Sequence, residues 1–439
     1  MCGRAGLKTM DQVERLDPKT LALGKRVEVN ALHLAVYRHS LSWLVAGNAV
    51  GVLLAALLLW PDLNDALAPL TYGRWMPLHL NWLLYGWSAL PLAGALLGFY
   101  LPEDARATSA ARLALWVWSV ALLFGGATWL AGQTSGKPFL DWTGIARLVW
   151  TVAGLVLWLV LFWHSRRRAE TRSWPARALL ALLLAVPFVL YWSAGAGVYP
   201  SVNPHSGGAT GASLLGSTLA VVAIFGLLPW LLRLESTADA RTRRLFGATF
   251  AISLALYAGI GHGDASHHRP DQIIGLGSLL VWVPLVWLYG RAFAWSPGSK
   301  RWLAAAFVWW LLLVVTGWIG FLPEISERVK FTNVLVAHSH LAMAGLVTSL
   351  HVVILLNLGR GRAPSGWSFW LWQSACALHV GALFWLGWRE GADPALLYVR
   401  GGVADWCYGL RLLAGAAMLL ASFAWLCTLG RHPDDSNQT

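Results

Sequence analysis

About twelve apolar stretches, joined by short polar connections, fill the chain between residues 39 and 430. Each has roughly the 20 apolar residues that a helix needs to cross the hydrocarbon core of a bilayer. We therefore predict an all-α, polytopic membrane protein with about twelve transmembrane helices and no soluble domain. The candidate spans are residues 39–60, 78–101, 110–132, 145–164, 177–196, 211–232, 245–262, 273–294, 302–322, 332–357, 368–388 and 408–430.

Composition excludes the alternative of several soluble domains. Hydrophobic residues make up 57% of the chain and charged residues only 12%, whereas a soluble domain carries about 25% charged residues. The net charge of +12 comes largely from arginines between the apolar blocks, which indicates membrane topology and no nucleic-acid partner. The four cysteines are scattered and form no C-x-x-C pair, so neither covalent haem c nor a structural zinc site is expected.

Lys and Arg also predict the orientation. They crowd the N-terminal residues 1–38 and the connections 166–177, 233–244 and 291–301, whereas the alternate connections are richer in Asp and Glu. Because cations concentrate in cytoplasmic loops, we expect both termini in the cytoplasm of a bacterial cell, with the chain in the inner membrane. The expected organisation is a basic arm without a cleavable signal peptide, a membrane domain and a short tail, namely residues 1–38, 39–430 and 431–439.

With that orientation, five histidines from four candidate spans fall at a similar depth, toward the outer face. Ionisable residues within a membrane are functional hypotheses by default, and neutral imidazole is the commonest metal ligand. Their convergence indicates bound metals or metal-containing cofactors. The five are His79, His205, His262, His338 and His340.

The pair His338 and His340 is the most specific of these signals. Residues two apart on an α-helix point about 200° apart, so the two imidazoles face different neighbours. That spacing suits two cofactors on either side of one helix, and the alternative is a pair of histidines that hydrogen-bond across the bundle. His79 could supply the second axial ligand to one of the cofactors, or it is a capped histidine near the interface.

A second metal is expected near the outer end of span 245–262. His262, His267, His268 and Asp264 lie together there, although the two adjacent histidines could equally belong to a solvated loop. His205 precedes a glycine-rich entry to span 211–232 and could approach a cofactor, or it is an ordinary loop histidine.

The remaining histidines are expected to be structural. His351 and His379 lie on the candidate spans 332–357 and 368–388, about three turns away from the layer of candidate ligands. The others are on the cytoplasmic side: His33, His39, His164 and His432.

This histidine pattern resembles the catalytic subunit I of the haem–copper oxidase superfamily, and the resemblance covers about residues 39–430. It implies twelve spans, with His79 and His340 on a low-spin haem b and His338 on a high-spin haem, expected to be b-type. It also implies a second metal, copper or non-haem iron, on His205, His262, His267 and His268, with Asp264 as an alternative oxygen ligand. The amino-acid sequence of several segments is similar to that of the cbb-type oxidase and nitric oxide reductase branch: Phe331-Thr332-Asn333, His79-Leu80-Asn81, Phe99-Tyr100-Leu101-Pro102-Glu103 and Pro270-Asp271.

Some positions depart from that pattern. The family's adjacent histidine pair would fall at His262-Gly263, so either this loop is remodelled or one metal ligand is lost. Tyr257 lies close to the place of the redox tyrosine of cbb-type oxidases. Spans 211–232 and 273–294 lack the glutamates of nitric oxide reductases, which favours dioxygen as the gas.

The resemblance implies a terminal respiratory reductase that passes electrons through haem b and reduces dioxygen to water. A cytochrome c subunit or a soluble cytochrome c would donate the electrons, and Arg389 and Arg400 are placed to bind haem propionates. Three alternatives stay open: a nitric oxide reductase, a haem-b electron-transfer or structural subunit with a degenerate second metal site, and a transporter without cofactors. Besides a small gas and the electron donor, membrane lipid is the expected partner.

Overall fold

The computed structural model describes residues 18–198, 210–237, 240–263, 265–359, 364–398 and 401–429. These residues fold into helices and short connections, with one isolated bridge between Ser236 and Phe293. The prediction of an all-α membrane protein is confirmed, because 11 helical segments in these ranges are long and apolar enough to cross a membrane.

The bounds of the helices follow the predicted spans closely. Single helices form seven of the spanning segments: α1 (Pro18–Leu59), α5 (Ala105–Leu130), α6 (Gly144–Ser165), α7 (Trp174–Ser193), α8 (Gly211–Leu231), α16 (Gly366–Ala392) and α17 (Val403–Leu429). Four are composite: α3 (Tyr72–Asn81) with η1 (Trp82–Ser88) and α4 (Leu90–Tyr100); α10 (Pro270–Gly277) with η3 (Ser278–Val281) and α11 (Trp282–Gly290); η4 (Pro297–Ser299) with α12 (Lys300–Gly320); and α14 (Asn333–His340) with η5 (Leu341–Val347) and α15 (Thr348–Leu358). The short helices α2 (Leu63–Ala66), η2 (Glu170–Arg172), α13 (Pro323–Val329) and η6 (Pro394–Leu397) lie in connections.

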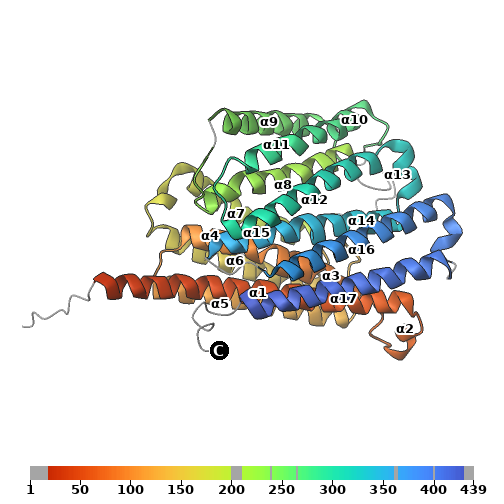
Figure 1. The fold of residues 1–439 in the computed structure, drawn as a ribbon, viewed down its shortest axis with the longest axis horizontal. Helices are drawn as coiled ribbons and strands as arrows, with labels where there is room; N and C mark the ends of the chain where they lie inside the picture. The colour runs from red at the N-terminus through yellow and green to blue at the C-terminus, as the bar shows by residue number, and fades with distance from the viewer. Residues whose placement is uncertain are drawn as a thin grey trace, which may run out of the picture.

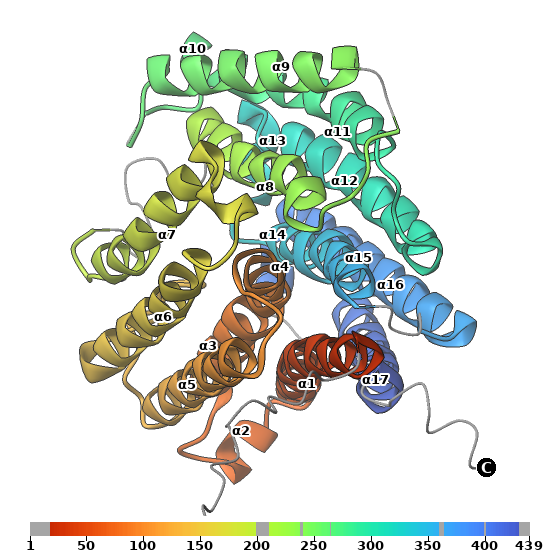
Figure 2. The same ribbon diagram turned by 90° about the vertical axis from the view of Figure 1, so that its left-hand side faces the viewer.

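The seventh predicted span forms the helix α9 (Ala240–Gly259), which is not among the 11 segments. Its first turns carry Arg241, Arg243 and Arg244, and these charges reduce its apolar length. Figure 2 shows α9 on the outside of the bundle, next to α8 and α11.

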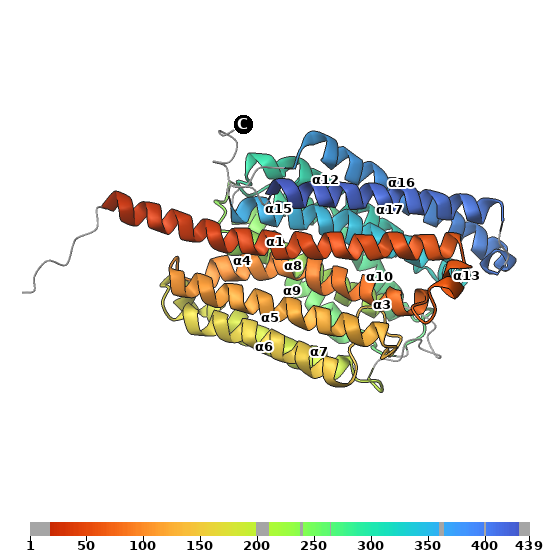
Figure 3. The ribbon, with the colours of Figure 1, turned by 90° about the horizontal axis from the view of Figure 1, so that it is seen from below.

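The helices run roughly side by side, and the N-terminal part of α1 extends beyond the bundle (Figures 1 and 3). Loops with α2 and α13 close the opposite end, called here the α2 end. The segments Tyr72–Tyr100 and Asn333–Leu358 are the most enclosed, with 61% and 67% of their most apolar window buried. These two segments therefore form the centre of the bundle, and they carry His79, His338 and His340.

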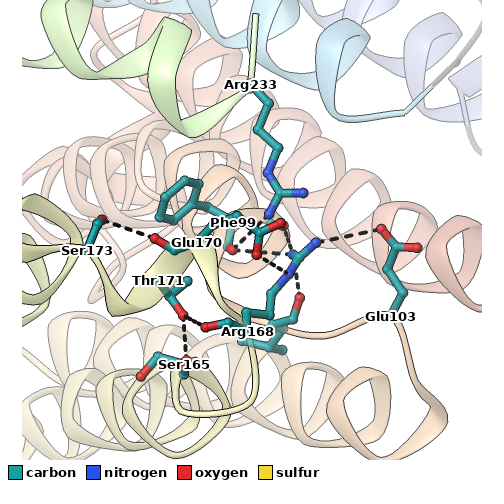
Figure 4. Close-up of polar contacts among 10 residues, drawn as sticks. Phe99, Glu103, Ser165, Arg168, Glu170, Thr171, Ser173 and Arg233 are labelled. Atoms are coloured by element: carbon teal, nitrogen blue, oxygen red, sulfur yellow. Dashed lines mark hydrogen bonds and ion pairs between the residues drawn. The ribbon is translucent and has the colours of Figure 1, made fainter.

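The C-terminal end of α4 is held by two arginines (Figure 4). The Arg168 guanidinium donates hydrogen bonds of 2.7–3.3 Å to the carbonyl oxygens of Gly98, Phe99 and Leu101. Arg233 donates to the Phe99 oxygen as well, at 3.3 Å. The last carbonyls of a helix lack backbone partners and carry partial negative charge. The two cations therefore stabilise the C-terminal end of the segment Tyr72–Tyr100, which carries His79.

Candidate functional site

His79 and His340 face each other inside the bundle. Both α3 and α14 begin at the α2 end, and each histidine lies about two turns into its helix (~3.6 residues per turn). Their ring centroids are 6.3 Å apart and their ring planes are inclined by 27°. The structure thus brings together two imidazoles from the two most enclosed segments.

The Nδ1 atom of each ring is held by a hydrogen bond with a backbone carbonyl. His79 Nδ1 lies 2.8 Å from the Gly47 oxygen, and His340 Nδ1 lies 2.8 Å from the Val336 oxygen. Because a carbonyl only accepts hydrogen bonds, Nδ1 carries the proton in both rings. The Nε2 atoms then hold free lone pairs, and no described residue bonds them. This is the arrangement of metal-binding histidines, whose second nitrogen donates to a carbonyl.

A glycine makes room for the His79 ring. A Cβ atom at Gly51 on α1 would lie 2.7 Å from His79 Cε1, closer than van der Waals contact allows. The absence of a side chain at this position lets α1 approach the imidazole and present the Gly47 carbonyl to it.

A cavity lies beside the two rings. Its lining is mainly apolar, with His79, His340, His379, Arg411 and Asn48 among the few polar side chains. A mostly apolar pocket with a few convergent polar groups is typical of a cofactor site.

His379 was expected to be remote from the candidate ligands, and this expectation is wrong. Its ring, 5% exposed, lies with its centroid 4.4 Å from that of His340 and lines the same cavity. Neither ring nitrogen makes a well-formed hydrogen bond within the described residues, although the ring lies beside the Arg411 backbone. His379 lies closer to His340 than expected because α16 extends further than predicted, to Ala392. In this register Gly387 packs against the backbone of Asn333, the first residue of α14, which brings His379 next to His340.

Arg411 also lines the cavity, on α17, and is 9% exposed. Among the described residues its polar neighbours are Tyr72 and Tyr408, and no carboxylate forms an ion pair with it. A guanidinium cannot be deprotonated in a protein, so a permanent positive charge faces this cavity. The sequence analysis missed this residue, although an ionisable side chain inside a candidate span is itself a functional signal.

Arg389, one of the two arginines expected to bind propionates, lies away from the cavity. Arg389 is exposed, with its guanidinium 6.0 Å from the ring centroid of Trp385, and it does not line the cavity. Arg400 lies outside the described residues.

His338 turns to another neighbour, as its spacing from His340 predicts. It does not line the cavity, and its Nδ1 lies 3.2 Å from Thr316 Oγ1 on α12. The Thr316 hydroxyl donates to the Leu312 carbonyl at 2.7 Å, so its oxygen can accept from a protonated His338 Nδ1. With its proton on Nδ1, His338 would leave Nε2 free, as His79 and His340 do.

The connection between α5 and α6 covers the cavity. Phe139 lines it, with a backbone φ of 64° that bulky residues rarely adopt, and its carbonyl accepts a 2.7 Å hydrogen bond from Tyr85. The Lys137 ammonium donates to the Ser193 and Gly195 carbonyls. Burial lowers the pKa of Lys137, as does the charge of a nearby arginine, whereas a neighbouring aspartate opposes the shift. These contacts fix the loop against the end of α7.

Of the residues expected to hold a second metal, the structure describes His262, His267 and His268, and these three form no metal site. His262 is exposed, and its Nε2 lies 2.8 Å from the Tyr257 carbonyl. His268 is also exposed and pairs with Glu327 at 3.0 Å, while His267 is half-buried. In the part of the chain that the structure describes, no group of three or more His, Cys, Asp or Glu side chains is arranged to hold one metal ion. His205 and Asp264 lie outside it.

Tyr257 packs on its neighbours through the ring. A Cβ atom at Gly216 on α8 would lie 2.8 Å from the Tyr257 ring. The ring also meets His262 edge-on, with centroids 4.7 Å apart. The structure thus places Tyr257 beside His262 and away from the cavity of His79 and His340.

No protein-family model matches the sequence. The chain is 21% identical over 398 residues to the Cbb3-type cytochrome c oxidase subunit CcoN1 of Stutzerimonas stutzeri, covering 81% of this chain and 82% of that protein. It is 27% identical over 154 residues to a bacteroid cytochrome c oxidase subunit 1 homologue of Bradyrhizobium diazoefficiens, covering 34% and 28%. A cytochrome c oxidase subunit 1 homologue of Azorhizobium caulinodans is 28% identical over 216 residues, covering 46% and 37%.

The resemblance to haem–copper oxidase subunit I is confirmed. The three relatives are named as cytochrome c oxidase subunits or their homologues, and the apolar helices support an integral membrane protein.

Proposed function

We propose that the chain is the haem-containing subunit of a terminal respiratory reductase. In this proposal His79 and His340 hold a low-spin haem b, and His338 holds a high-spin haem, expected to be b-type, at which dioxygen is reduced to water. The observation that carries the proposal is the pair of opposed imidazoles of His79 and His340 beside a cavity.

The two imidazoles would hold the low-spin haem b, because their ring centroids lie 6.3 Å apart and both rings line the same cavity. Both rings also have their proton on Nδ1 and leave Nε2 free for a metal.

The side chains around the pair would serve the same ligand. Carbonyl acceptors at Nδ1 orient each imidazole and increase its basicity. Arg411, buried without a carboxylate partner, would bind the anionic propionates, in place of the roles expected for Arg389 and Arg400. The bound haems supply electron transfer and gas reduction, while the apolar lining excludes water.

The high-spin site would be on the other side of α14. Thr316 orients His338 through Nδ1, and a Cβ atom at Gly317 would lie 3.3 Å from His338 Cε1. The lack of a side chain at residue 317 leaves space next to the ring edge that would bind iron.

The second metal, copper or non-haem iron, rests on the family resemblance alone, with His205, His262, His267, His268 and Asp264 as the candidate ligands and Tyr257 as a catalytic side chain. The contacts of His262 with Tyr257 and of His268 with Glu327 do not fit a metal site, so we derive no step through it. They favour a second candidate function, a haem-b electron-transfer or structural subunit whose second metal site is degenerate.

The electron donor would be a cytochrome c subunit or a soluble cytochrome c. Both termini would lie in the cytoplasm, which places the α2 end at the outer face. Nitric oxide reduction on the same scaffold remains the alternative activity.

The test is a reduced-minus-oxidised optical spectrum of the purified protein, repeated under carbon monoxide, with metal analysis and oxygen and nitric oxide consumption. A low-spin b signal plus a CO-sensitive component, copper and oxygen consumption support the main proposal. Nitric oxide consumption with extra iron supports the alternative gas. A low-spin signal without CO response and without a second metal supports the electron-transfer subunit, and a spectrum without haem overturns all three.

A further inference from the structure

Both histidine-bearing helices widen into a π-helix shortly after the histidine, within three residues of His79 and at the residue after His340. The segment η1 (Trp82–Ser88) follows His79, and η5 (Leu341–Val347) follows His340. In a π-helix the backbone bonds skip one more residue than in an α-helix, so the junctions leave some carbonyls without an N–H partner. Such carbonyls need donors from side chains, because an unsatisfied buried carbonyl costs free energy.

A hydroxyl closes each π segment in the same way. Ser88 Oγ donates to the Leu83 carbonyl at 3.1 Å, and Thr348 Oγ1 donates to the Met343 carbonyl at 3.0 Å. Each hydroxyl lies at the C-terminal end of its π segment and reaches back to a carbonyl within it.

Indoles from neighbouring helices hold the middle of the segments. Trp118 on α5 donates from Nε1 to the Tyr85 carbonyl at 2.8 Å, and Trp372 on α16 donates to the Ala344 carbonyl at 2.9 Å. Each π segment is thereby bonded to a second helix of the bundle.

Two further contacts join the π segments to each other. Trp87 Nε1 donates to Thr348 Oγ1 at 3.0 Å, with both side chains 1% exposed. The buried His351 ring lies between the last residues of the segments, with Nε2 2.7 Å from the Ser88 carbonyl and Nδ1 2.5 Å from that of Val347. Whichever ring nitrogen carries the proton, it bonds one of the two segments.

We infer that Trp87 and Thr348 are positioning residues that set the separation and tilt of the His79 and His340 imidazoles. The two residues follow their histidines at the same interval along the chain, and the bond between them links equivalent points of the two helices. The Thr348 hydroxyl uses its single donor on the Met343 carbonyl and accepts a hydrogen bond from Trp87. This inference rests on the proposed function, since the imidazoles matter as ligands of a low-spin haem.

The experiment compares Thr348→Val and Trp87→Phe with the wild-type complex. Valine keeps the shape of threonine and removes the hydroxyl, and phenylalanine removes the indole donor. The readouts are haem content, the low-spin electron paramagnetic resonance signal, which responds to the relative orientation of the two imidazoles, and the midpoint potential of haem b. Thr151→Val on α6 is the matched control, because its hydroxyl bonds only the Arg147 carbonyl of its own helix at 2.8 Å.

The inference predicts that both variants shift the low-spin signal and the midpoint potential while haem content stays at the wild-type level. The double variant shifts them no further than Thr348→Val alone, and Thr348→Ser restores the wild-type values. Unchanged signals and potentials in a haem-loaded Trp87→Phe protein overturn the inference, even if Thr348→Val fails to fold. Absence of haem from the wild-type protein is a different result and overturns the proposed function.

Discussion

The ring of His379 lies 4.4 Å from that of His340, so the cavity contains three imidazoles and not two. Since His340 already bonds the Val336 carbonyl, His379 acts on it through ring contact and through its own dipole. We therefore expect His379→Phe to retain the low-spin haem and to shift its midpoint potential. Redox titration of the purified variant measures the shift. Cys376→Ala, one turn away on the same helix and fully buried, is the control; an equal shift in both would indicate a general packing effect.

Gly51→Ala should lower the content of low-spin haem. The added Cβ would lie 2.7 Å from His79 Cε1, so the ring must turn or α1 must move away. Losing an orienting contact of this kind typically costs about 10–100-fold in metal affinity. Pyridine haemochrome analysis per protein measures the loss. Gly415→Ala is the control. Gly415 lines the same cavity, but a Cβ atom added there would lie 3.6 Å from Val52, an ordinary contact distance, so we expect normal haem content in this variant.

Arg411→Leu should weaken haem retention more than Arg389→Leu. The first change removes a buried cation that faces the cavity, whereas the second removes an exposed one. A hydrogen bond to a charged group contributes about 1.5–3 kcal/mol, so we expect haem affinity to fall about tenfold or more. Haem loss to apomyoglobin over time measures the difference. Equal loss rates in the two variants would assign the propionates elsewhere.

Thr316→Val should alter the CO-sensitive haem and leave the low-spin haem unchanged. The variant removes the acceptor of His338 Nδ1, which frees the ring to rotate and lowers its basicity. The carbon monoxide difference spectrum and the CO dissociation rate report on this site. Ser217→Ala on α8, an exposed position whose hydroxyl bonds its own helix, is the control. A change confined to the low-spin spectrum would contradict the assignment of His338.

Arg168→Met should destabilise the bundle without touching the histidines. Its guanidinium bonds three carbonyls at the end of α4 (Figure 4) and is 12% exposed. We expect a loss of about 2 kcal/mol or more in the free energy of unfolding, seen as a lower melting temperature in detergent. Arg167→Met, 49% exposed and paired with Asp104, should change stability by less than about 1 kcal/mol.

The sequence was sufficient to predict the spans and the histidine pair at the centre of the bundle. Span positions follow from apolar length, and the depths of His79 and His340 follow from their distance to the span starts. The divergence of His338 and His340 follows from helical geometry. The same reasoning did not find His379, because the end of α16 was predicted four residues early, and did not find Arg411, because it was counted as part of a span.

The dispersed outer histidines show a different limit of sequence reasoning. His262, His267 and His268 lie near one another along the chain, but His262 bonds the Tyr257 carbonyl of α9 and His268 pairs with Glu327 on α13. Loop conformation depends on backbone turns and on charges from distant segments, which residue spacing does not encode.

The π segments also determine which neighbours the C-terminal halves of the two central helices, α4 and α15, contact. An α-helix turns about 100° per residue, so one additional residue accommodated in η1 or η5 rotates everything beyond it by that amount relative to a continuous α-helix. His351 and Tyr100 lie beyond the π segments, where they contact the carbonyls of Ser88 and Ala176, so these contacts depend on the rotation. Removing a single residue from either segment would therefore leave its histidine in place and turn the remaining half of the helix to face the wrong partners.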